Sequence, residues 1–437
     1  MSGGNMQFEV APGGKLHGEL RVPGDKSISH RAAMFASLAE GRSHVSGFLD
    51  GADCLATLSA FEAMGVTAQR DGQSLVVDGL GLHGLKAPQG PLDLGNSGTS
   101  MRLMAGLMAG QSFATTLTGD RSLSVRPMGR VVQPLQQMGA NIQSDARGCA
   151  PLQIAPSDGL RGINYSSPVA SAQVKSALLL AGLYAQGRTQ VTEPGASRDH
   201  TERMLQAFGI DVEARPGLAA LSGGQTMRAT DIQVPADISS AAFFLVGAAI
   251  SPGSELLLPA VGVNPTRTGV IDVLRAMGAE IELQNERSFG GEPVADLWVR
   301  GGGLQGIDID PALVASAIDE FPALFIAAAC AEGVTRVTGA EELRVKESDR
   351  ISAMVNGLKT LGIKAEGTPD GAVIHGGRLQ GGQVDSLGDH RVAMSFAMAA
   401  LRASAPIRIL DCDNVNTSFP GFATLAARAG LGIEVRR

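Results

Sequence analysis

A polar stretch near the beginning of the chain, residues 23–31, combines side chains that bind anions. It reads Pro-Gly-Asp-Lys-Ser-Ile-Ser-His-Arg and leads into an apolar run typical of a buried helix. Asp25 can cap that helix, while Lys26 and Arg31 add charge at a helix N-terminus, where backbone N–H groups already attract anions. A capped surface helix with solvated charges would show the same residues. The stretch indicates an anion site if the pattern recurs.

The pattern does recur, as a polar entry followed by a helical segment rich in Ala, Leu and Met. Each entry offers capping side chains and free N–H groups for a ligand. We expect these entries to begin helices whose N-termini bind anions. Besides the first, the entries lie at 96–99, 171–173, 237–240, 316–319 and 388–391.

Two loops in the first half carry further candidate ligands. Asn96, Gly98 and Thr99 lie in a turn whose small residues let a ligand approach the backbone. Arg126 lies in the polar loop 119–128. Its planar guanidinium matches carboxylates and phosphates, although surface arginines at a turn remain an alternative.

The second half supplies candidate acid–base groups. Lys346 and Arg350 are four residues apart, a spacing that predicts one helix face with Glu347 beside them. Asp319 interrupts an apolar run, and a carboxylate in such a place is suited to general acid–base catalysis. A surface ion-pair ladder is the alternative. With Arg391, the candidates comprise six cations and two carboxylates, which favours proton transfer between anionic substrates over covalent catalysis.

A glycine-marked repeat organises the chain. A helix ending in Gly followed by a short strand recurs about every 70 residues, and Gly after a helix is typical of a positive φ. Each unit reads as a βαβαββ module, and six modules divide as three plus three. We expect one half at 22–236 and another formed by 1–21 plus 237–437, with the helix N-termini converging on the cleft between them. The markers are Gly65, Gly139, Gly209, Gly278, Gly362 and Gly432.

Composition excludes several classes. With 44% hydrophobic residues, a net charge of −7 and 4% aromatic residues, the chain is predicted to bind neither membranes nor nucleic acid. The beginning of the sequence lacks a signal-peptide pattern, which predicts a cytoplasmic protein. The four cysteines are dispersed and predict buried thiols, and no His spacing indicates a metal site.

Four motifs resemble the 5-enolpyruvylshikimate-3-phosphate (EPSP) synthase family, 3-phosphoshikimate 1-carboxyvinyltransferases of the shikimate pathway. They lie at 25–31, 95–99, 344–350 and 389–391. The resemblance spans essentially the whole chain and implies an α/β fold of two inverse α/β-barrel-like domains, each of three βαβαββ repeats, with the active site in the interdomain cleft. It also implies transfer of the enolpyruvyl group of phosphoenolpyruvate to the 5-hydroxyl of shikimate 3-phosphate, in a monomer that needs no metal or organic cofactor.

The same resemblance implies roles for individual residues. Asp319 would deprotonate the shikimate hydroxyl, and Glu347, with Lys346 or Lys26, would protonate the methylene carbon. The shikimate 3-phosphate ligands would be Lys26, Ser27, Arg31, Ser171, Ala172, Gln173, Arg198, Asp319 and Lys346. The phosphoenolpyruvate ligands would be Lys26, Asn96, Gly98, Thr99, Arg126, Gln173, Arg350 and Arg391.

The chain departs from the family pattern at some positions. Thr417 stands where many members carry a Lys before a Thr-Phe-Pro sequence. Leu103 and Ala172 replace the Pro and Ser of the plant-like branch, which indicates the second bacterial branch. Glyphosate is a candidate inhibitor, and Gly98 is the residue usual in sensitive members.

Two alternatives remain at this point. UDP-N-acetylglucosamine enolpyruvyl transferases share the fold but usually carry a Cys on the loop corresponding to 119–127, where this chain has none. A non-catalytic anion-binding protein would need the cations but neither Asp319 nor Glu347.

Overall fold

The computed structural model describes residues 6–437 and contains six small β-sheets in that range. Each sheet has three or four strands, and five of them combine one parallel pair with antiparallel pairs. In the sheet ordered β6-β7-β9-β8, β6 (Leu92–Asp93) runs parallel to β7 (Thr115–Thr118), whereas β9 (Leu152–Ala155) is antiparallel to β7 and to β8 (Asn141–Gln143). The repeated βαβαββ module predicted from the sequence is therefore present, and the α/β fold class is confirmed.

The chain forms two compact units. Unit 1 comprises residues up to 23, 235–288 and 293–437, and unit 2 comprises 24–234 with 289–292. Each unit has its own hydrophobic core. The sequence had placed the first half at 22–236 without the short segment 289–292. That segment is the end of a β-hairpin, and its sequence carried no signal that separates it from the strands around it.

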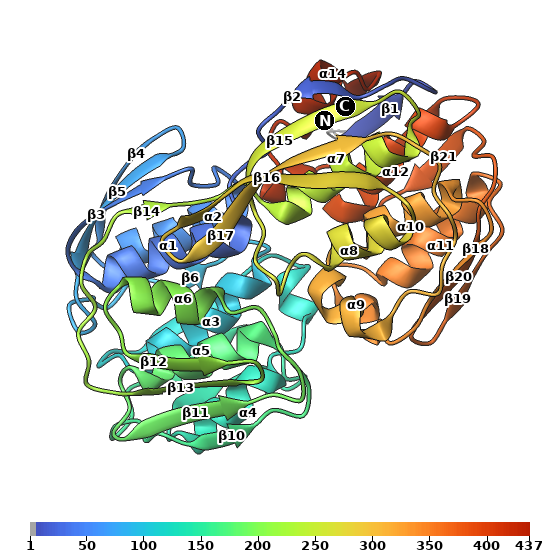
Figure 1. Cartoon of the computed structure of the whole chain (residues 1–437). Helices are drawn as coiled ribbons and strands as arrows, with labels where there is room; N and C mark the ends of the chain where they lie inside the picture. Colours follow the sequence, from blue (N-terminus) through green and yellow to red (C-terminus); the bar gives the residue numbers. More distant parts are fainter. Residues whose placement is uncertain (1–5) are drawn as a thin grey trace. The chain divides into compact units, whose positions relative to one another are not determined.

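Unit 2 holds three of the modules (Figure 1). Its first sheet takes its parallel strand from the end of the unit, since β14 pairs with β3. Its other elements, apart from the second sheet given above, are α1 (Lys26–Leu38), β3 (Glu40–Ser46), α2 (Ala52–Ala63), β4 (Thr67–Asp71), β5 (Ser74–Leu80), α3 (Gly98–Ala109), η1 (Leu123–Val125), α4 (Gly129–Gln137), β10 (Asn164–Ser166), α5 (Ala172–Gly182), β11 (Arg188–Thr192), α6 (His200–Ala207), β12 (Val212–Arg215), β13 (Leu218–Ser222) and β14 (Ile232–Gln233).

The first strands of unit 1 come from the beginning of the chain. β2 pairs with β15, and β1 lies between β22 and β23, so residues 7–19 complete sheets formed mainly by the C-terminal half. The first elements of the unit are β1 (Gln7–Val10), β2 (His17–Glu19), α7 (Ile238–Ile250), β15 (Glu255–Gly262), α8 (Gly269–Ala276), β16 (Glu280–Phe289), β17 (Glu292–Arg300), α9 (Pro311–Ala317) and α10 (Phe321–Cys330). The others are β18 (Val334–Val337), η2 (Glu341–Val345), α11 (Arg350–Thr360), β19 (Ala365–Thr368), β20 (Gly371–His375), β21 (Gly382–Asp385), α12 (His390–Ala399), η3 (Ala400–Arg402), β22 (Ile407–Leu410), α13 (Val415–Ser418), α14 (Phe422–Ala429) and β23 (Ile433–Arg436).

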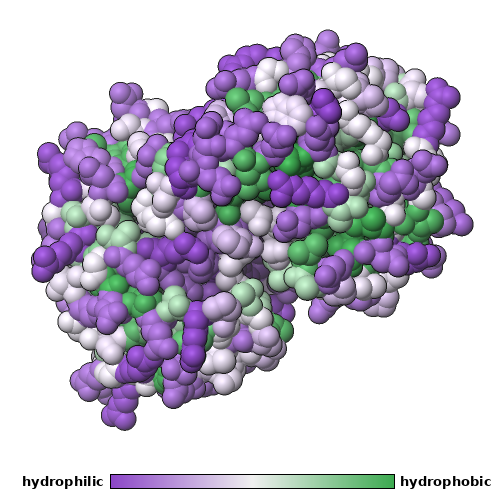
Figure 2. Space-filling view, viewed as in Figure 1, coloured by the Kyte–Doolittle hydropathy of each residue, from purple (hydrophilic) through white to green (hydrophobic). Residues whose placement is uncertain are grey.

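The most apolar helices lie inside each unit and the sheets lie outside them (Figure 1). All residues of α7 are buried, as are nearly all residues of α1, α3 and α10. A helix that is apolar on every side has to be surrounded by other elements. On the visible face, hydrophilic side chains predominate, with hydrophobic ones in groups between them (Figure 2). In these central helices the sides are therefore covered by other elements, and the accessible residues lie near the helix ends.

Five of the six marker glycines adopt the predicted positive φ, between 82° and 97°. The sixth was placed wrongly. α14 ends at Ala429, and Gly430 rather than Gly432 caps it, with a φ of 116°. The sequence Gly-Leu-Gly offers two candidates, and the C-terminal helix ends two residues earlier than the repeat suggests.

The predicted entry at 316–319 is also not the beginning of a helix. Residues 311–317 form the short helix α9, and α10 begins at Phe321 after a turn, with Glu320 at its N-cap position. Pro322 is tolerated in the first turn of a helix, where its missing N–H costs nothing, and therefore favours this starting point.

Within residues 6–437, no helix combines the length and apolar character needed to cross a lipid bilayer. The four cysteines are free thiols. Cys54, Cys149 and Cys412 are buried as predicted, whereas Cys330 is partly exposed.

The close packing of α3 on α5 gives a stability prediction. A Cβ added to Gly106 would lie 2.1 Å from the carbonyl oxygen of Ala177, a contact with helix backbone that cannot move easily. We expect Gly106→Ala to lower the free energy of unfolding by about 1–3 kcal/mol, as overpacking of a core does. Urea unfolding measures the change, and Gly90→Ala is the control because a Cβ there meets no atom within 4 Å. Equal stability of the two variants would contradict the packing described.

Candidate functional site

The N-terminus of α1 holds Lys26 and Ser27 in unit 2. The Asp25 carboxylate caps the helix by accepting the N–H of Ile28 at 2.9 Å. Lys26 is the first helical residue, and its ammonium pairs with the buried carboxylate of Asp53 in the first turn of α2. The Lys26 side chain remains 24% exposed, so a ligand can reach it. Asp53 was not predicted as its partner, because nothing in the sequence links the two helix ends.

Arg31 lies one turn deeper in α1 and is buried. Its guanidinium donates to the hydroxyls of Thr201 at 2.7 Å and Ser176 at 3.0 Å, and to the carbonyl oxygen of Ser27 at 2.9 Å. Burial lowers the pKa of Arg31 to about 10, against the opposing effect of the Glu202 carboxylate. Arg31 thus joins α1, α5 and α6, and it uses three of the five N–H donors of a guanidinium to do so.

His30 connects the N-terminal parts of three helices. One ring nitrogen lies 2.8 Å from the hydroxyl of Thr57 in α2 and 3.2 Å from that of Ser100 in α3. The other lies 3.4 Å from the hydroxyl of Ser97, the N-cap of α3. Burial, together with the charges of Lys26 and Arg31, lowers the pKa of His30 well below its ordinary value. The ring is therefore neutral at pH 7 and serves as a hydrogen-bonding link.

The predicted ligands Asn96 and Arg126 are in direct contact. The Arg126 guanidinium donates to the Asn96 side-chain oxygen at 2.6 Å and to the Ser122 hydroxyl at 3.1 Å. The Asn96 amide in turn donates to the Asp120 carboxylate at 2.7 Å. The two polar loops of this module thus form one hydrogen-bonded structure next to the N-terminus of α3.

Gln173 joins the helix ends of α3 and α5. Its side-chain nitrogen donates to the Thr99 hydroxyl at 3.0 Å, and its oxygen accepts from the Arg102 guanidinium at 2.8 Å. Gly98 lies under these groups, since a Cβ there would be 2.8 Å from an Arg102 nitrogen and 3.2 Å from an Arg126 nitrogen. The predicted ligands of unit 2 therefore converge at the N-termini of its central helices. Ser171 and Ala172 begin α5, and Arg198 lies in the loop before α6.

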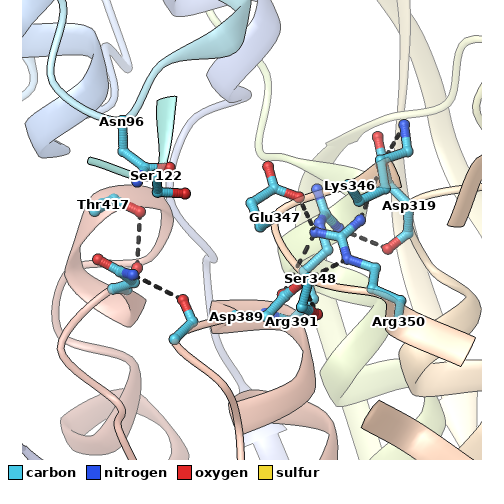
Figure 3. A network of polar contacts seen from close by, with 12 residues as sticks. Asn96, Ser122, Asp319, Lys346, Glu347, Ser348, Arg350, Asp389, Arg391 and Thr417 are labelled. Atoms are coloured by element: carbon cyan, nitrogen blue, oxygen red, sulfur yellow. Dashed lines mark hydrogen bonds and ion pairs between the residues drawn. The ribbon is translucent and has the colours of Figure 1, made fainter. Parts of the chain in front are cut away.

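A second group of charges surrounds Arg350 in unit 1 (Figure 3). Its guanidinium, 1% exposed, pairs with three carboxylates: Asp389 at 2.8 Å, Glu347 at 2.6 Å and Asp319 at 3.3 Å. Burial opposes the charge of Arg350, but the three carboxylates raise its pKa above the ordinary value. Burial likewise opposes ionisation of Asp389, and Arg350 holds its pKa below the usual range. Arg350 and Asp389 are therefore both charged at pH 7.

The candidate base Asp319 lies between two cations. The ammonium of Lys346 is 3.5 Å from the same carboxylate oxygen that faces Arg350. The side chains of Asp319 and Glu347 are 15% and 27% exposed, whereas Asp389 is buried. Asp319 and Glu347 are therefore the carboxylates of this cluster that can exchange protons with a bound molecule.

Glu320, the residue after Asp319, contacts two further arginines of unit 1. Its fully buried carboxylate lies 3.6 Å from the Arg391 guanidinium and 3.9 Å from that of Arg267, and it accepts a hydrogen bond from Ser239 at the start of α7. Arg391 also donates to the backbone carbonyl of Asp319 at 3.0 Å. These contacts could not be predicted from the sequence, which shows only that Glu320 is an acidic residue next to Asp319.

The predicted helix face with Lys346 and Arg350 is wrong. Lys346 follows the 3₁₀ helix η2, and α11 begins at Arg350 with Asp349 as its N-cap. The polar run 347–349 turns the chain between them. Both cations nevertheless reach Asp319. Thr417 donates its hydroxyl to the carbonyl oxygen of Asn414 at 2.7 Å.

Three potential metal ligands also lie together in unit 2, although the sequence predicted none. They are Asp199, His200 and Glu292, and the last is at the hairpin end that joins this unit. His200 is 2.7 Å from Glu292, and Asp199 pairs with Arg203 at 2.9 Å.

The neutral state of His30 predicts a pH-dependent stability. The unfolded chain takes up a proton on His30 below about pH 6.5, while the native protein does not. The native state should therefore lose up to about 1.4 kcal/mol per pH unit from this residue as the pH falls below 6.5. In His30→Gln this loss disappears, so the difference in unfolding free energy between pH 7 and pH 5 should shrink. In the control His44→Gln, which changes an exposed histidine, the difference in unfolding free energy between pH 7 and pH 5 should equal that of the wild type. Identical pH dependence of wild type and His30→Gln would contradict the role.

Comparison with known proteins identifies the family. The profile of EPSP synthase (3-phosphoshikimate 1-carboxyvinyltransferase) matches residues 10–425. The 3-phosphoshikimate 1-carboxyvinyltransferase of Alkalilimnicola ehrlichii is 64% identical over 98% of this chain and 96% of the relative. That of Methylococcus capsulatus is 63% identical over 98% of both chains.

Solved structures agree with this result. The EPSP synthase of Acinetobacter baumannii superimposes with a TM-score of 0.90 at 54% identity, covering 99% of this chain and all of that one. The enolpyruvyl transferase NikO of Streptomyces tendae has a TM-score of 0.80 over 99% of both chains, but at 16% identity it shows the shared fold alone. With a matching profile over nearly its whole length and relatives of this similarity, the chain belongs to the EPSP synthase family.

Proposed function

We propose that this enzyme transfers the carboxyvinyl group of phosphoenolpyruvate to the 5-hydroxyl of shikimate 3-phosphate and releases phosphate. The observation that carries the proposal is the partly exposed carboxylate pair, Asp319 and Glu347, held on the buried Arg350. Anion binding alone would need the cations without these two acids. The names of the relatives support shikimate 3-phosphate as the acceptor, so the nucleotide-sugar acceptor is not retained.

Shikimate 3-phosphate is assigned to the helix N-termini of unit 2. Lys26 and Ser27 at α1 and Ser171 and Ala172 at α5 offer an ammonium, hydroxyls and the N-termini of two helices, which suit a phosphate. The further ligands proposed for this substrate are Arg31, Gln173, Arg198, Asp319 and Lys346.

Phosphoenolpyruvate carries a carboxylate and a phosphate, and several arginines suit a molecule with two anionic groups. Arg126 is held in position by Asn96 and Ser122, and Arg350 is held by its carboxylates. The further ligands proposed are Lys26, Gly98, Thr99, Gln173 and Arg391. Glyphosate is proposed as an inhibitor of the same enzyme, which we expect to be a cytoplasmic monomer.

The reaction then requires two proton transfers for addition and a third for elimination. The oxygen of the 5-hydroxyl forms a bond to C2 of phosphoenolpyruvate while Asp319 accepts the hydroxyl proton. Glu347, with Lys346 or Lys26, donates a proton to the C3 methylene. The resulting tetrahedral intermediate loses phosphate from C2, and one C3 proton returns to the protein as the double bond forms again. Lys346 and Arg350 lie 3.5 Å and 3.3 Å from one oxygen of Asp319 and hold this carboxylate in place.

Replacing the proposed base tests this mechanism. In Asp319→Asn the side chain keeps its shape but cannot accept the proton, so turnover should fall about 10²-fold or more. Binding of shikimate 3-phosphate, measured by calorimetry, should persist because the unit 2 ligands are unchanged. Asp308→Asn is the control, since Asp308 is an exposed partner of Arg336. Unchanged phosphate release by Asp319→Asn would exclude the assigned role.

A further inference from the structure

A buried group of charges lies directly behind the N-terminus of α5. Lys175, in the second turn of that helix, pairs with Glu202 of α6 at 2.8 Å and with Glu193 at 3.4 Å. The side chains of all three are no more than 5% exposed. Buried ion pairs contribute little net stability, because desolvation offsets their attraction. Their presence here calls for a role other than stability.

The Glu193 carboxylate connects two segments that are distant in sequence. One oxygen accepts the backbone N–H of Ser171 at 2.6 Å, and the other accepts the hydroxyl of Ser197 at 2.6 Å. Ser171 is the N-cap of α5, and Ser197 directly precedes Arg198. Such short bonds to an ionised carboxylate are among the strongest that a protein forms.

Lys175 fixes the position of this carboxylate in turn. Besides its two ion pairs, its ammonium lies 3.5 Å from the carbonyl oxygen of Ser197. The backbone N–H of Glu193 is bonded to the carbonyl of Gly217 at 2.8 Å, which ties the residue to the hairpin of β12 and β13. Both the backbone and the carboxylate of Glu193 are thus held in place. The carboxylate therefore has little freedom to follow Ser171 and Ser197 if these residues move.

We propose that Glu193 is a positioning residue for shikimate 3-phosphate, because its carboxylate sets the spacing between the N-terminus of α5 and the loop that carries Arg198. The inference rests on the proposed function for the identity of the ligand. Glu193 itself is buried, and both oxygens of its carboxylate are bonded to protein groups. What it controls is the distance between two sets of ligands, so its length matters more than its charge.

Two conservative variants separate length from charge. Glu193→Asp keeps the charge beside Lys175 but is one methylene too short to reach both serines, so the KM for shikimate 3-phosphate should rise about tenfold or more. Glu193→Gln keeps the length, and its amide can accept from Ser171 and donate to the Ser197 hydroxyl. Its KM should stay within about threefold of wild type. In both variants the KM for phosphoenolpyruvate should change less than threefold.

A control variant is measured in the same KM assay. Glu213→Asp shortens an exposed glutamate on β12 that pairs with Arg188, and should leave both KM values unchanged. If the KM of Glu193→Asp for shikimate 3-phosphate equals that of the wild type, the inference is wrong. It is also wrong if this KM rises only in Glu193→Gln, because the charge of Glu193 and not its length would then control binding. If the KM values of Glu193→Asp for shikimate 3-phosphate and for phosphoenolpyruvate rise equally, the substitution has damaged the structure in general, and the inference is also wrong.

Failure of the proposed function gives a different result. If the wild-type protein releases no phosphate with shikimate 3-phosphate and is not stabilised against heat by that ligand, both the function and the inference fail. If the wild type is active and Glu193→Asp is equally active with unchanged KM values, the positioning role alone fails.

Discussion

The charge of buried cations has to be balanced by carboxylates, and this requirement shapes both units. Arg350 is buried with Asp389, Glu347 and Asp319 around it, while Lys175 is buried between Glu193 and Glu202. An isolated charge in such a place would cost several kcal/mol, so each cation depends on acids from neighbouring segments. The same acids hold the segments together, and two of those around Arg350 remain partly exposed for chemistry.

The repeated module explains why candidate ligands gather at helix ends. Asp25, Ser97, Ser171, Asp237 and Asp389 are N-caps of the central helices, and each satisfies a backbone N–H within its own first turn. The residues that follow these caps then stand at the positive end of a helix dipole. The helices are buried along most of their length, and partly exposed residues such as Lys26, Thr99 and Gln173 lie in their first turns. The structural repeat therefore presents a similar helix N-terminus in several modules, and Lys26, Gly98 and Gln173 are the residues that differ there.

The sequence was sufficient for the features that depend on local chemistry. Capping residues and C-terminal glycines act within one helical turn, so the modules and most helix ends could be predicted. Gly430 and the start of α10 were missed because neighbouring residues offered competing signals. Lys346 and Arg350 were expected on one helix, yet they meet at Asp319 through a turn that spacing alone does not reveal.

Long-range partners could not be predicted in the same way. Asp53, Glu193 and Glu320 each lie in segments without a motif, and their importance comes from the cations that the fold brings to them. Glu292 reaches unit 2 from the end of a long hairpin, for which the sequence contains no marker. Compensation of buried charge is a property of the assembled core, so it becomes visible only in three dimensions.

The most direct test of the central claim is phosphate release from phosphoenolpyruvate by the wild-type protein, with shikimate 3-phosphate or UDP-N-acetylglucosamine as acceptor and no added metal. An acid–base enzyme of the kind described releases phosphate with shikimate 3-phosphate and not with the nucleotide sugar. Release with the nucleotide sugar alone, or with neither acceptor, would contradict the account.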